Sequence, residues 1–149
     1  MKKLIAIALV ALVLAGCSTG GAKTQTLACK QEAEGASMDS TFTFTDAGLT
    51  SLKQTTVIAI PEDQKDSIDS ITTALDASKE QINAIDGATY EYSVNETAAT
   101  ITVTYDVTKM DDETLLGFGF TDDMKVDGKF NIDKIAETYK AININCEVK

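Results

Sequence analysis

The fold is decided by residues 38–60, which read MDSTFTFTDAGLTSLKQTTVIAI. The first eight residues alternate between two kinds of side chain, which indicates a half-buried antiparallel strand. One face would carry Met38, Ser40, Phe42 and Phe44, and the other Asp39, Thr41, Thr43 and Thr45. Asp46-Ala47-Gly48 is typical of a hairpin turn, because glycine tolerates the positive φ that such turns need. Residues 49–60 are therefore predicted to form the return strand.

On the C-terminal side of this hairpin, Pro61 ends the strand and favours the first turn of a helix, where its fixed φ fits. An apolar face follows at helical spacing, made of Ile68, Ile71, Leu75, Ile82 and Ile85. Ser78 occupies the missing step and loosens that face, and Asp86-Gly87 is the expected stop. The opposite face is mostly acidic, so we expect this helix to pack on a sheet rather than lie on a membrane surface.

The remaining segments add strands on both sides of this unit. We predict a first strand over Thr24–Glu34, a second hairpin over Thr89–Asn95 and Thr100–Val107, a short helix over Asp133–Tyr139 and a last strand over Ala141–Val148. Residues 108–128 are less regular. The predicted order is β-β-β-α-β-β-α-β, with one long and one short helix. Hairpins with segregated helices indicate an α+β fold with a mainly antiparallel sheet.

The N-terminus resembles the signal of a bacterial lipoprotein. Lys2 and Lys3 precede an apolar run, and Leu14-Ala15-Gly16-Cys17 closes it in the order of a lipobox. The run is too short to span a membrane but suits a signal peptide. We therefore predict a signal peptide over residues 1–16, an acylated Cys17 with a flexible tether over 17–23, and a single domain over 24–149. The alternative is an ordinary secretory signal followed by an accidental cysteine.

The predicted modification determines the expected location. In lipoproteins with this signal the cysteine thiol takes a diacylglycerol, and two long acyl chains hold a protein stably at a membrane. We therefore expect the domain at the extracytoplasmic face of a bacterial membrane.

The composition narrows the classes of function. Without residues 1–16 the chain keeps 11 lysines against 23 acids, a net charge of −12, and it contains no arginine, histidine or tryptophan. Such a chain lacks the basic patch of a nucleic-acid binder. The absence of histidine excludes the Ser-His-Asp triad, Cys-His catalysis and histidine-bound zinc. Carboxylate, lysine, tyrosine or cysteine chemistry remains open.

Two cysteines remain besides Cys17, and they stand near the two ends of the predicted domain. Cys29 and Cys146 are an even remainder in an exported chain, which favours a disulfide. If they are bridged, the first and last strands must be near neighbours. The alternative is two reduced thiols that are buried separately.

Two further segments are candidates for a site. Asp122, Asp123 and Asp127 supply oxygen ligands but lack the register of a calcium loop, as do the acids at 62–66 and 111–113. At all three places the alternative is that the acids are solvated surface residues.

A second candidate segment is an apolar run interrupted by glycines, which could form a pocket wall or a partner patch. Its residues are Leu115, Leu116, Phe118 and Phe120. The alternative, which we favour, is that they fill the core.

Several segments together resemble the YehR-type family of small bacterial lipoproteins, over about residues 24–149. They are Thr41-Phe42-Thr43-Phe44 with its glycine turn, Leu49-Thr50-Ser51-Leu52-Lys53-Gln54-Thr55, Thr102-Val103-Thr104-Tyr105-Asp106 and the terminus Glu147-Val148-Lys149. The resemblance is weak over 61–88. It implies the lipid anchor and the α+β fold. The family has no assigned activity, so no site residue follows from it, and no family role is carried over to the two cysteines.

The sequence therefore predicts a lipid-anchored, non-enzymatic binding or interaction module of the cell envelope, without a cofactor. Its expected partners are the membrane, through the diacylglyceryl anchor, and an envelope protein, polymer or small ligand, but not nucleic acid. The alternative is a small redox or carboxylate-based enzyme or accessory that uses Cys29 and Cys146 or the acids. A third reading is a purely structural envelope protein.

Overall fold

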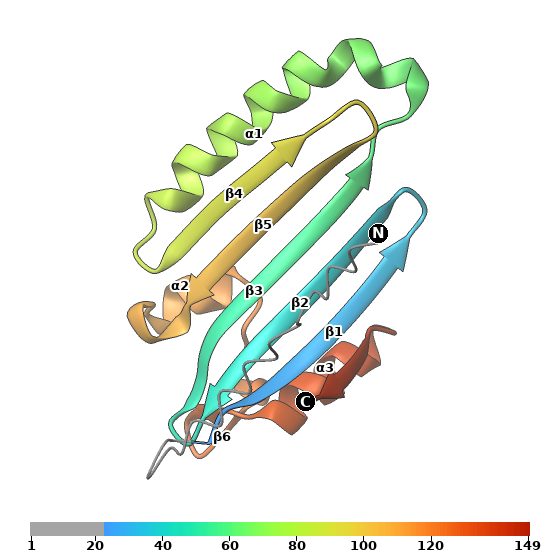
Figure 1. Cartoon of the computed structure of the whole chain (residues 1–149). Coiled ribbons are helices and arrows are strands. Elements are labelled where there is room, and N and C mark those ends of the chain that lie inside the picture. Colours follow the sequence, from blue (N-terminus) through green and yellow to red (C-terminus); the bar gives the residue numbers. More distant parts are fainter. Residues whose placement is uncertain (1–22) are drawn as a thin grey trace, which may run out of the picture.

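The computed structural model describes residues 23–149, so the predicted signal peptide, Cys17 and most of the predicted tether lie outside the described residues. Six strands form one sheet in the order β4-β5-β3-β2-β1-β8, with every neighbouring pair antiparallel (Figure 1). The strands are β1 (Gln25–Ala33), β2 (Ala36–Thr45), β3 (Gly48–Ala59), β4 (Ala88–Val94), β5 (Ala98–Asp106) and β8 (Asn145–Val148).

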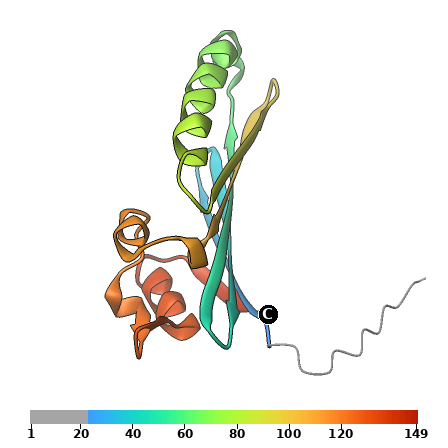
Figure 2. The same cartoon turned by 90° about the vertical axis from the view of Figure 1, so that its left-hand side faces the viewer.

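The α-helices of the described chain lie on one face of the sheet, and no helix covers the other face there (Figure 2). They are α1 (Ile68–Asn83), α2 (Asp112–Gly117) and α3 (Ile132–Ala141). Short 3-10 turns and a small hairpin complete the chain: η1 (Glu62–Ser67), η2 (Val107–Lys109), η3 (Asp122–Met124), β6 (Lys125–Val126) and β7 (Lys129–Phe130). None of the helices between residues 23 and 149 has the length and apolar character needed to cross a membrane. The α+β class and the mainly antiparallel sheet are confirmed.

Hydrogen bonds define two ends of the sheet. At the tether end, Thr26 and Lys149 exchange both of their backbone hydrogen bonds, at N···O distances of 3.2 and 2.8 Å. At the distal end, the N–H of Ala59 donates to the carbonyl of Gly35, and that of Ile60 donates to the carbonyl of Thr97, both at 2.8 Å. The β1–β2 turn, the end of β3 and the β4–β5 turn therefore lie together at the distal end.

The predicted hairpin of residues 38–60 forms the centre of the sheet. Phe42 stands opposite Leu52 in the β2–β3 register, and a bulge follows between Thr43 and Phe44. The hydroxyl of Thr50 donates to the carbonyl of Thr43 at 3.0 Å beside this bulge. Phe42 and Phe44 are both buried, so the alternating pattern correctly assigned the core face.

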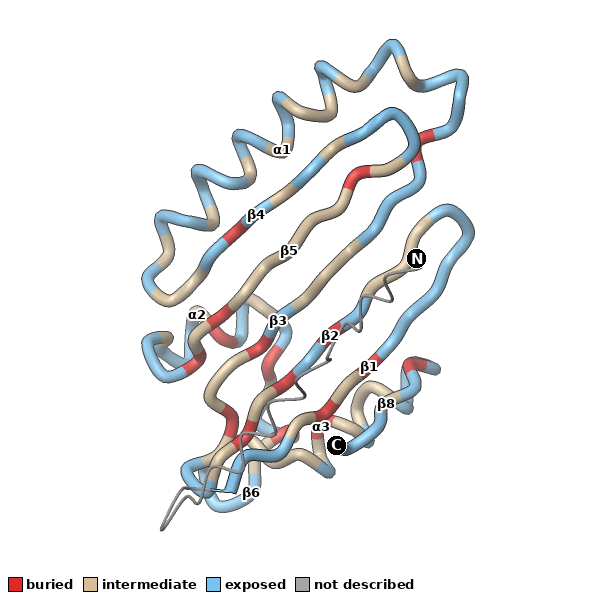
Figure 3. Tube along the Cα trace, in the orientation of Figure 1, coloured by how far each residue is buried: buried red, intermediate tan, exposed pale blue. Residues whose placement is uncertain are grey.

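The core gathers toward the tether end (Figure 3). Phe42, Leu27 and Ile135 are fully buried and bring β2, β1 and α3 together. Phe42 also makes edge-to-face contacts with Phe120 and Tyr139, at centroid distances of 6.3 and 5.3 Å, a favoured geometry for aromatic rings. This end is therefore a two-layer core of sheet and helices.

The structure corrects the prediction for the last strand. Ala141–Val148 was expected to be extended, but α3 continues to Ala141 and β8 begins only at Asn145. The N–H groups of Ile142 and Ile144 both donate to the carbonyl of Tyr139, and Asn143 adopts a positive φ of 62°. Helix-ending hydrogen bonds have thus replaced strand pairing, because asparagine tolerates this left-handed conformation.

The less regular residues 108–128 contain an additional helix. Asp111 caps α2, because its side chain accepts a hydrogen bond from the N–H of Thr114 at 2.8 Å. Before this segment, Gly87 directly precedes β4 with a φ of 84°, and a Cβ there would lie 2.8 Å from the carbonyl oxygen of Asp106. A glycine is thus required where α1 turns into the second hairpin.

Candidate functional site

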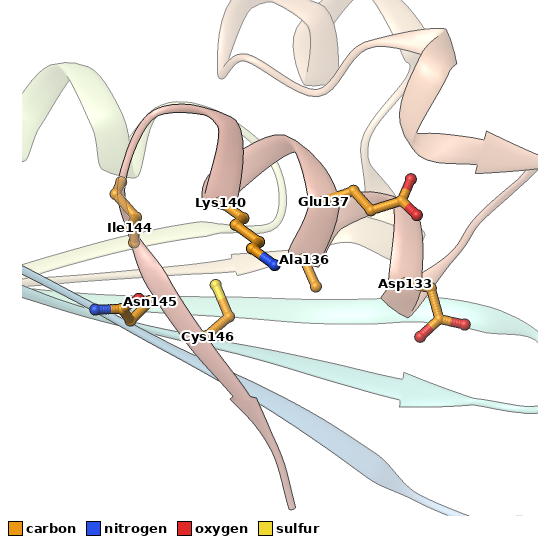
Figure 4. A pocket seen from close by; sticks show the side chains of 7 residues that line it. All are labelled: Asp133, Ala136, Glu137, Lys140, Ile144, Asn145 and Cys146. Carbon is orange, nitrogen blue, oxygen red and sulfur yellow. The ribbon is translucent and has the colours of Figure 1, made fainter.

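A first candidate site is the groove between α3 and β8 at the tether end. Its volume is about 600 Å³, and Figure 4 shows the residues that line it, Asp133, Ala136, Glu137, Lys140, Ile144, Asn145 and Cys146. Helix α3 is held above it by the fully buried Ile135 and by the side chain of Asn131, which accepts hydrogen bonds from the N–H groups of Asp133 and Lys134 at 3.0 and 3.2 Å.

The disulfide lies at the base of this groove. Cys29 and Cys146 stand directly opposite each other in the β1–β8 register and form the predicted bridge, with Cα atoms 4.0 Å apart. Cys29 is buried, whereas Cys146 is half-buried and lines the groove. Figure 4 shows that Lys140 and the sulfur of Cys146 extend into the space between α3 and β8. The bridge is therefore approachable from the Cys146 side.

The four apolar residues of the α2 segment do not share one environment. Leu115 and Phe120 are buried in the core. Phe118 packs against Tyr105, with ring centroids 4.5 Å apart. Leu116 is 59% exposed. The segment therefore closes the core with three side chains and leaves Leu116 in contact with solvent.

The three candidate acids near residue 125, which are Asp122, Asp123 and Asp127, do not share one environment. Asp122 forms an ion pair with Lys125 at 2.9 Å, and Asp112 forms one at 3.2 Å. Hydrogen bonds to Asp122 and Asp112 raise the pKa of Lys125, and its ammonium lies 5.0 Å from the centre of the Phe130 ring. Asp123 and Asp127 are exposed. Residues 23–149 contain no group of three His, Cys, Asp or Glu side chains placed to hold a metal ion.

A second candidate site is a shallow cavity of about 210 Å³ at the distal end, which we call the distal groove. It is lined by Gln31, Ala33, Ala36, Ser37, Met38 and Thr56. Gln31 and Thr56 both stand opposite Met38 in neighbouring strands. Because Met38 alternates in step with Phe42, these three residues are on the core face of the sheet. The distal groove is therefore a part of the core face that remains accessible to solvent.

Exposed apolar side chains border the distal groove. Ile58 stands opposite Ala36 and is 42% exposed, and its neighbour Val57 on the other face is 37% exposed. This surface could not be predicted from the sequence, since the run Val57-Ile58-Ala59-Ile60 has the pattern of a strand end. The signal that was present is the alternation itself, which places Met38 on the same face as the core.

Helix α1 lies along the edge strand β4. The side chain of Asn83 accepts a hydrogen bond from the N–H of Tyr90 at 2.6 Å and donates to its carbonyl at 3.5 Å. The hydroxyl of Tyr92 donates to Asp76 at 2.5 Å, and this hydrogen bond is the main cause that raises the pKa of Tyr92. These contacts fix the helix over the β4 edge of the sheet.

Comparisons with known proteins agree with the fold. A scan against protein-family models finds no match, and a search of curated proteins finds none either. The NMR structure of the Escherichia coli YehR protein superposes with a TM-score of 0.68 at 16% identity, covering 85% of this chain and 93% of that one. The NMR structure of a protein from Streptococcus pneumoniae TIGR4 gives 0.57 at 17% identity, covering 99% and 96%. The chain therefore has a YehR-like α+β fold.

Proposed function

We propose that the protein is a lipid-anchored, non-enzymatic interaction module on the extracytoplasmic face of a bacterial membrane, and that its docking surface is the distal groove with Ile58. The observation that carries the proposal is the position of this groove. It continues the core face of the sheet beyond the region that α2 and α3 cover, and its lining is mostly apolar. Accessible apolar surface of this kind is typical of sites for other proteins.

The position of the groove also fits an anchor at Cys17. The described chain enters β1 at the tether end, and the distal groove lies where β1 and β2 turn at the other end of the sheet. A lipid at Cys17 would therefore hold the tether end near the membrane, and the distal groove would face the periplasm or the cell exterior.

Cell fractionation tests the anchor. The full chain and its Cys17→Ala variant are expressed in a bacterial host, and membranes are separated from soluble material. We expect the parent in the membrane fraction and the variant in the soluble fraction, because the variant has no thiol to accept a diacylglycerol. A variant that stays in the membranes would contradict the anchor.

Photo-crosslinking on intact cells tests the interaction module. A photoreactive amino acid replaces Ile58 at the distal groove and, as the matched control, Thr41 on the uncovered face of the sheet. We expect crosslinked protein from position 58 and little from position 41. The absence of adducts at both positions would contradict a protein-docking function.

A second candidate function is a redox accessory that exchanges the Cys29–Cys146 bridge with a partner dithiol. It is favoured by the place of Cys146 in the wall of the α3–β8 groove. Structural bridges resist the glutathione pool, so equilibration of the full chain in glutathione buffers, followed by thiol alkylation, separates the two functions. Reduction at a mild potential supports the redox accessory, and resistance supports a structural bridge.

A further inference from the structure

Exposed acids surround the distal groove. The distal segments 31–38, 56–67 and 93–100 contain six acids and a single basic residue, Lys65. The acids are Glu32, Glu34, Glu62, Asp63, Asp66 and Glu96, and all six are exposed. Lys65 contacts Glu62 at 3.5 Å and Glu96 at 4.0 Å. The distal end thus carries an excess of negative charge around an apolar floor.

The distribution of charge differs at the tether end. Lys23, Lys109, Lys125, Lys129, Lys134 and Lys149 belong to the segments that surround the start of β1 and the helices α2 and α3. Several of them are paired with acids, including Lys125 with Asp122 and Lys134 with Glu137, both at 2.9 Å. The tether end also carries many acids, so the ends differ in that lysines are interspersed with acids there but are scarce at the distal end, where the local excess of acids attracts cations.

We propose that the distal groove binds a cationic amphipathic helix of a partner protein. The apolar face of that helix would lie on Met38, Thr56 and Ile58, and its lysines or arginines would face the surrounding acids. This inference rests on the proposed function and names the chemistry of the partner. An amphipathic helix laid on an apolar groove is a recurring mode of recognition, and this face of the sheet already carries α1 and α3.

Electrostatic repulsion excludes two other occupants of the distal groove, a second copy of the chain and an anionic membrane surface. A second copy of the chain would place the same six acids against each other, and like charges brought together at an interface are repelled. The anionic lipids of a bacterial membrane would be repelled in the same way, because binding to them requires basic residues. A cationic segment is the occupant for which both the apolar floor and the acidic surround are favourable.

A binding titration tests the proposal with a defined probe. The purified full chain is placed in nanodiscs of zwitterionic phosphatidylcholine and titrated with a fluorescent leucine–lysine peptide that forms an amphipathic helix. A leucine–glutamate peptide of the same pattern is the control for charge, and a shuffled leucine–lysine peptide is the control for amphipathicity. We expect saturable binding of the first peptide and little binding of the other two.

Two matched sets of charge variants locate the binding. Glu34→Gln, Asp63→Asn and Asp66→Asn remove three exposed acids at the distal end, whereas Asp46→Asn, Asp123→Asn and Asp127→Asn remove three near the tether end. We expect the distal set to weaken binding about tenfold, which corresponds to about 1.4 kcal/mol. The tether-end set should leave it nearly unchanged. Equal weakening by both sets would show attraction to the overall charge and would overturn the proposal.

Two groove variants test the apolar floor. The double variant Met38→Gln, Ile58→Gln is expected to weaken binding about tenfold at physiological salt, where electrostatic attraction is screened. Thr56→Lys is the second variant, because it adds a like charge to the groove without removing an apolar residue. Circular dichroism establishes that each variant is folded. Unchanged binding of the folded variants would overturn the proposal.

The experiments distinguish a wrong partner from a failure of the docking function itself. If the peptide does not bind but position 58 still crosslinks to protein on cells, the docking surface is supported and the proposal of a cationic helical partner is wrong. If position 58 gives no crosslink, the docking function itself fails.

Discussion

The two ends of the molecule use amphipathic helices differently. At the tether end, α3 has ten residues and buries Ile135 completely. At the distal end, α1 has sixteen residues and none of them is fully buried. Helix α3 contacts the edge strand β8 and its interior neighbour β1, and its Tyr139 reaches Phe42 of β2, whereas the main neighbour of α1 is the edge strand β4. The shorter helix is therefore the one that completes the core.

This difference shows that amphipathicity does not measure how much a helix contributes to a core. A helix whose side chains reach the interior strands is surrounded by apolar groups there, but a helix that contacts only an edge strand meets the sheet along one side. The part of the core face that α1 leaves uncovered is the distal groove. The weaker coverage of one end thus accounts for both its exposure and its candidate role in binding.

The largest expected effect comes from the disulfide at the tether end. The double variant Cys29→Ala, Cys146→Ala removes a bridge that closes a loop with a sequence separation of 117 residues. Loop-entropy reasoning gives a loss of about 4–5 kcal/mol in the free energy of unfolding. Urea unfolding measures it, with Cys17→Ala as the control variant. A loss no larger than that of Cys17→Ala would show that the bridge contributes little to the tether end.

A matched pair of substitutions compares the two helices directly. Ile135→Ala in α3 empties a fully buried site and should cost about 2–5 kcal/mol. Ile82→Ala in α1 removes a half-buried side chain and should cost about 1 kcal/mol. Urea unfolding of both variants gives the two values. Equal losses would contradict the difference between the ends.

A smaller effect is expected where a single amide fixes α1 to the sheet. Asn83→Ala removes both hydrogen bonds to the backbone of Tyr90 and should cost about 1–2 kcal/mol. Because few groups hold α1, we expect faster hydrogen exchange in α1 and β4 alone. Asn131→Ala at the start of α3 is the control, since it should lower stability across the molecule. If hydrogen exchange in Asn83→Ala became faster across the whole molecule, this would contradict the expectation that the distal end opens separately.

The smallest expected effect is on the pH dependence of stability. Burial raises the pKa of Tyr105 and Tyr139, and the Asp76 hydrogen bond raises that of Tyr92, from the ordinary value of 10.0. The folded state thus holds these protons more tightly than the unfolded state, so the contribution is complete below pH 10 and is lost as the pH rises through the folded pKa values.

Ultraviolet titration of the tyrosinates checks this expectation together with urea unfolding at increasing pH. Asp76→Asn should lower the pKa of Tyr92 alone, because it removes the charged acceptor at the distal end. The buried Tyr105 and the half-buried Tyr139 should titrate as before. A titration of Tyr92 that does not respond to this substitution would show that the Asp76 contact does not form in solution.

Much of the fold could be predicted because its signals are local. The alternation around Phe42 and Phe44 marks the central hairpin, and the apolar period marks the long helix. Its predicted bounds were wrong, because the residues directly after Pro61 form the 3-10 helix η1 and α1 ends at Asn83, before the predicted stop at Gly87. The end of α3 could not be predicted, since residues 141–148 suit a strand and the hydrogen bonds to Tyr139 decide otherwise. The helix α2 was missed because its six residues are too few to establish a period.

The candidate sites divide in the same way. The sequence alone indicated the pairing of Cys29 with Cys146, because an exported chain with two remaining cysteines has a single possible bridge. It did not indicate that Cys146 would line a groove, because that depends on where α3 packs. The distal groove was not visible either, since Met38 and Ile58 have the pattern of core residues.

The sequence by itself determined which face of each main strand is apolar, that one long helix follows the central hairpin, and that the chain is strongly acidic. These properties depend on the spacing of neighbouring residues and on composition. Only the tertiary structure decided which part of the apolar face is covered. Coverage depends on contacts between segments far apart in the chain, and α1 over β4 and α3 over β1 leave Met38 and its neighbours open to a partner.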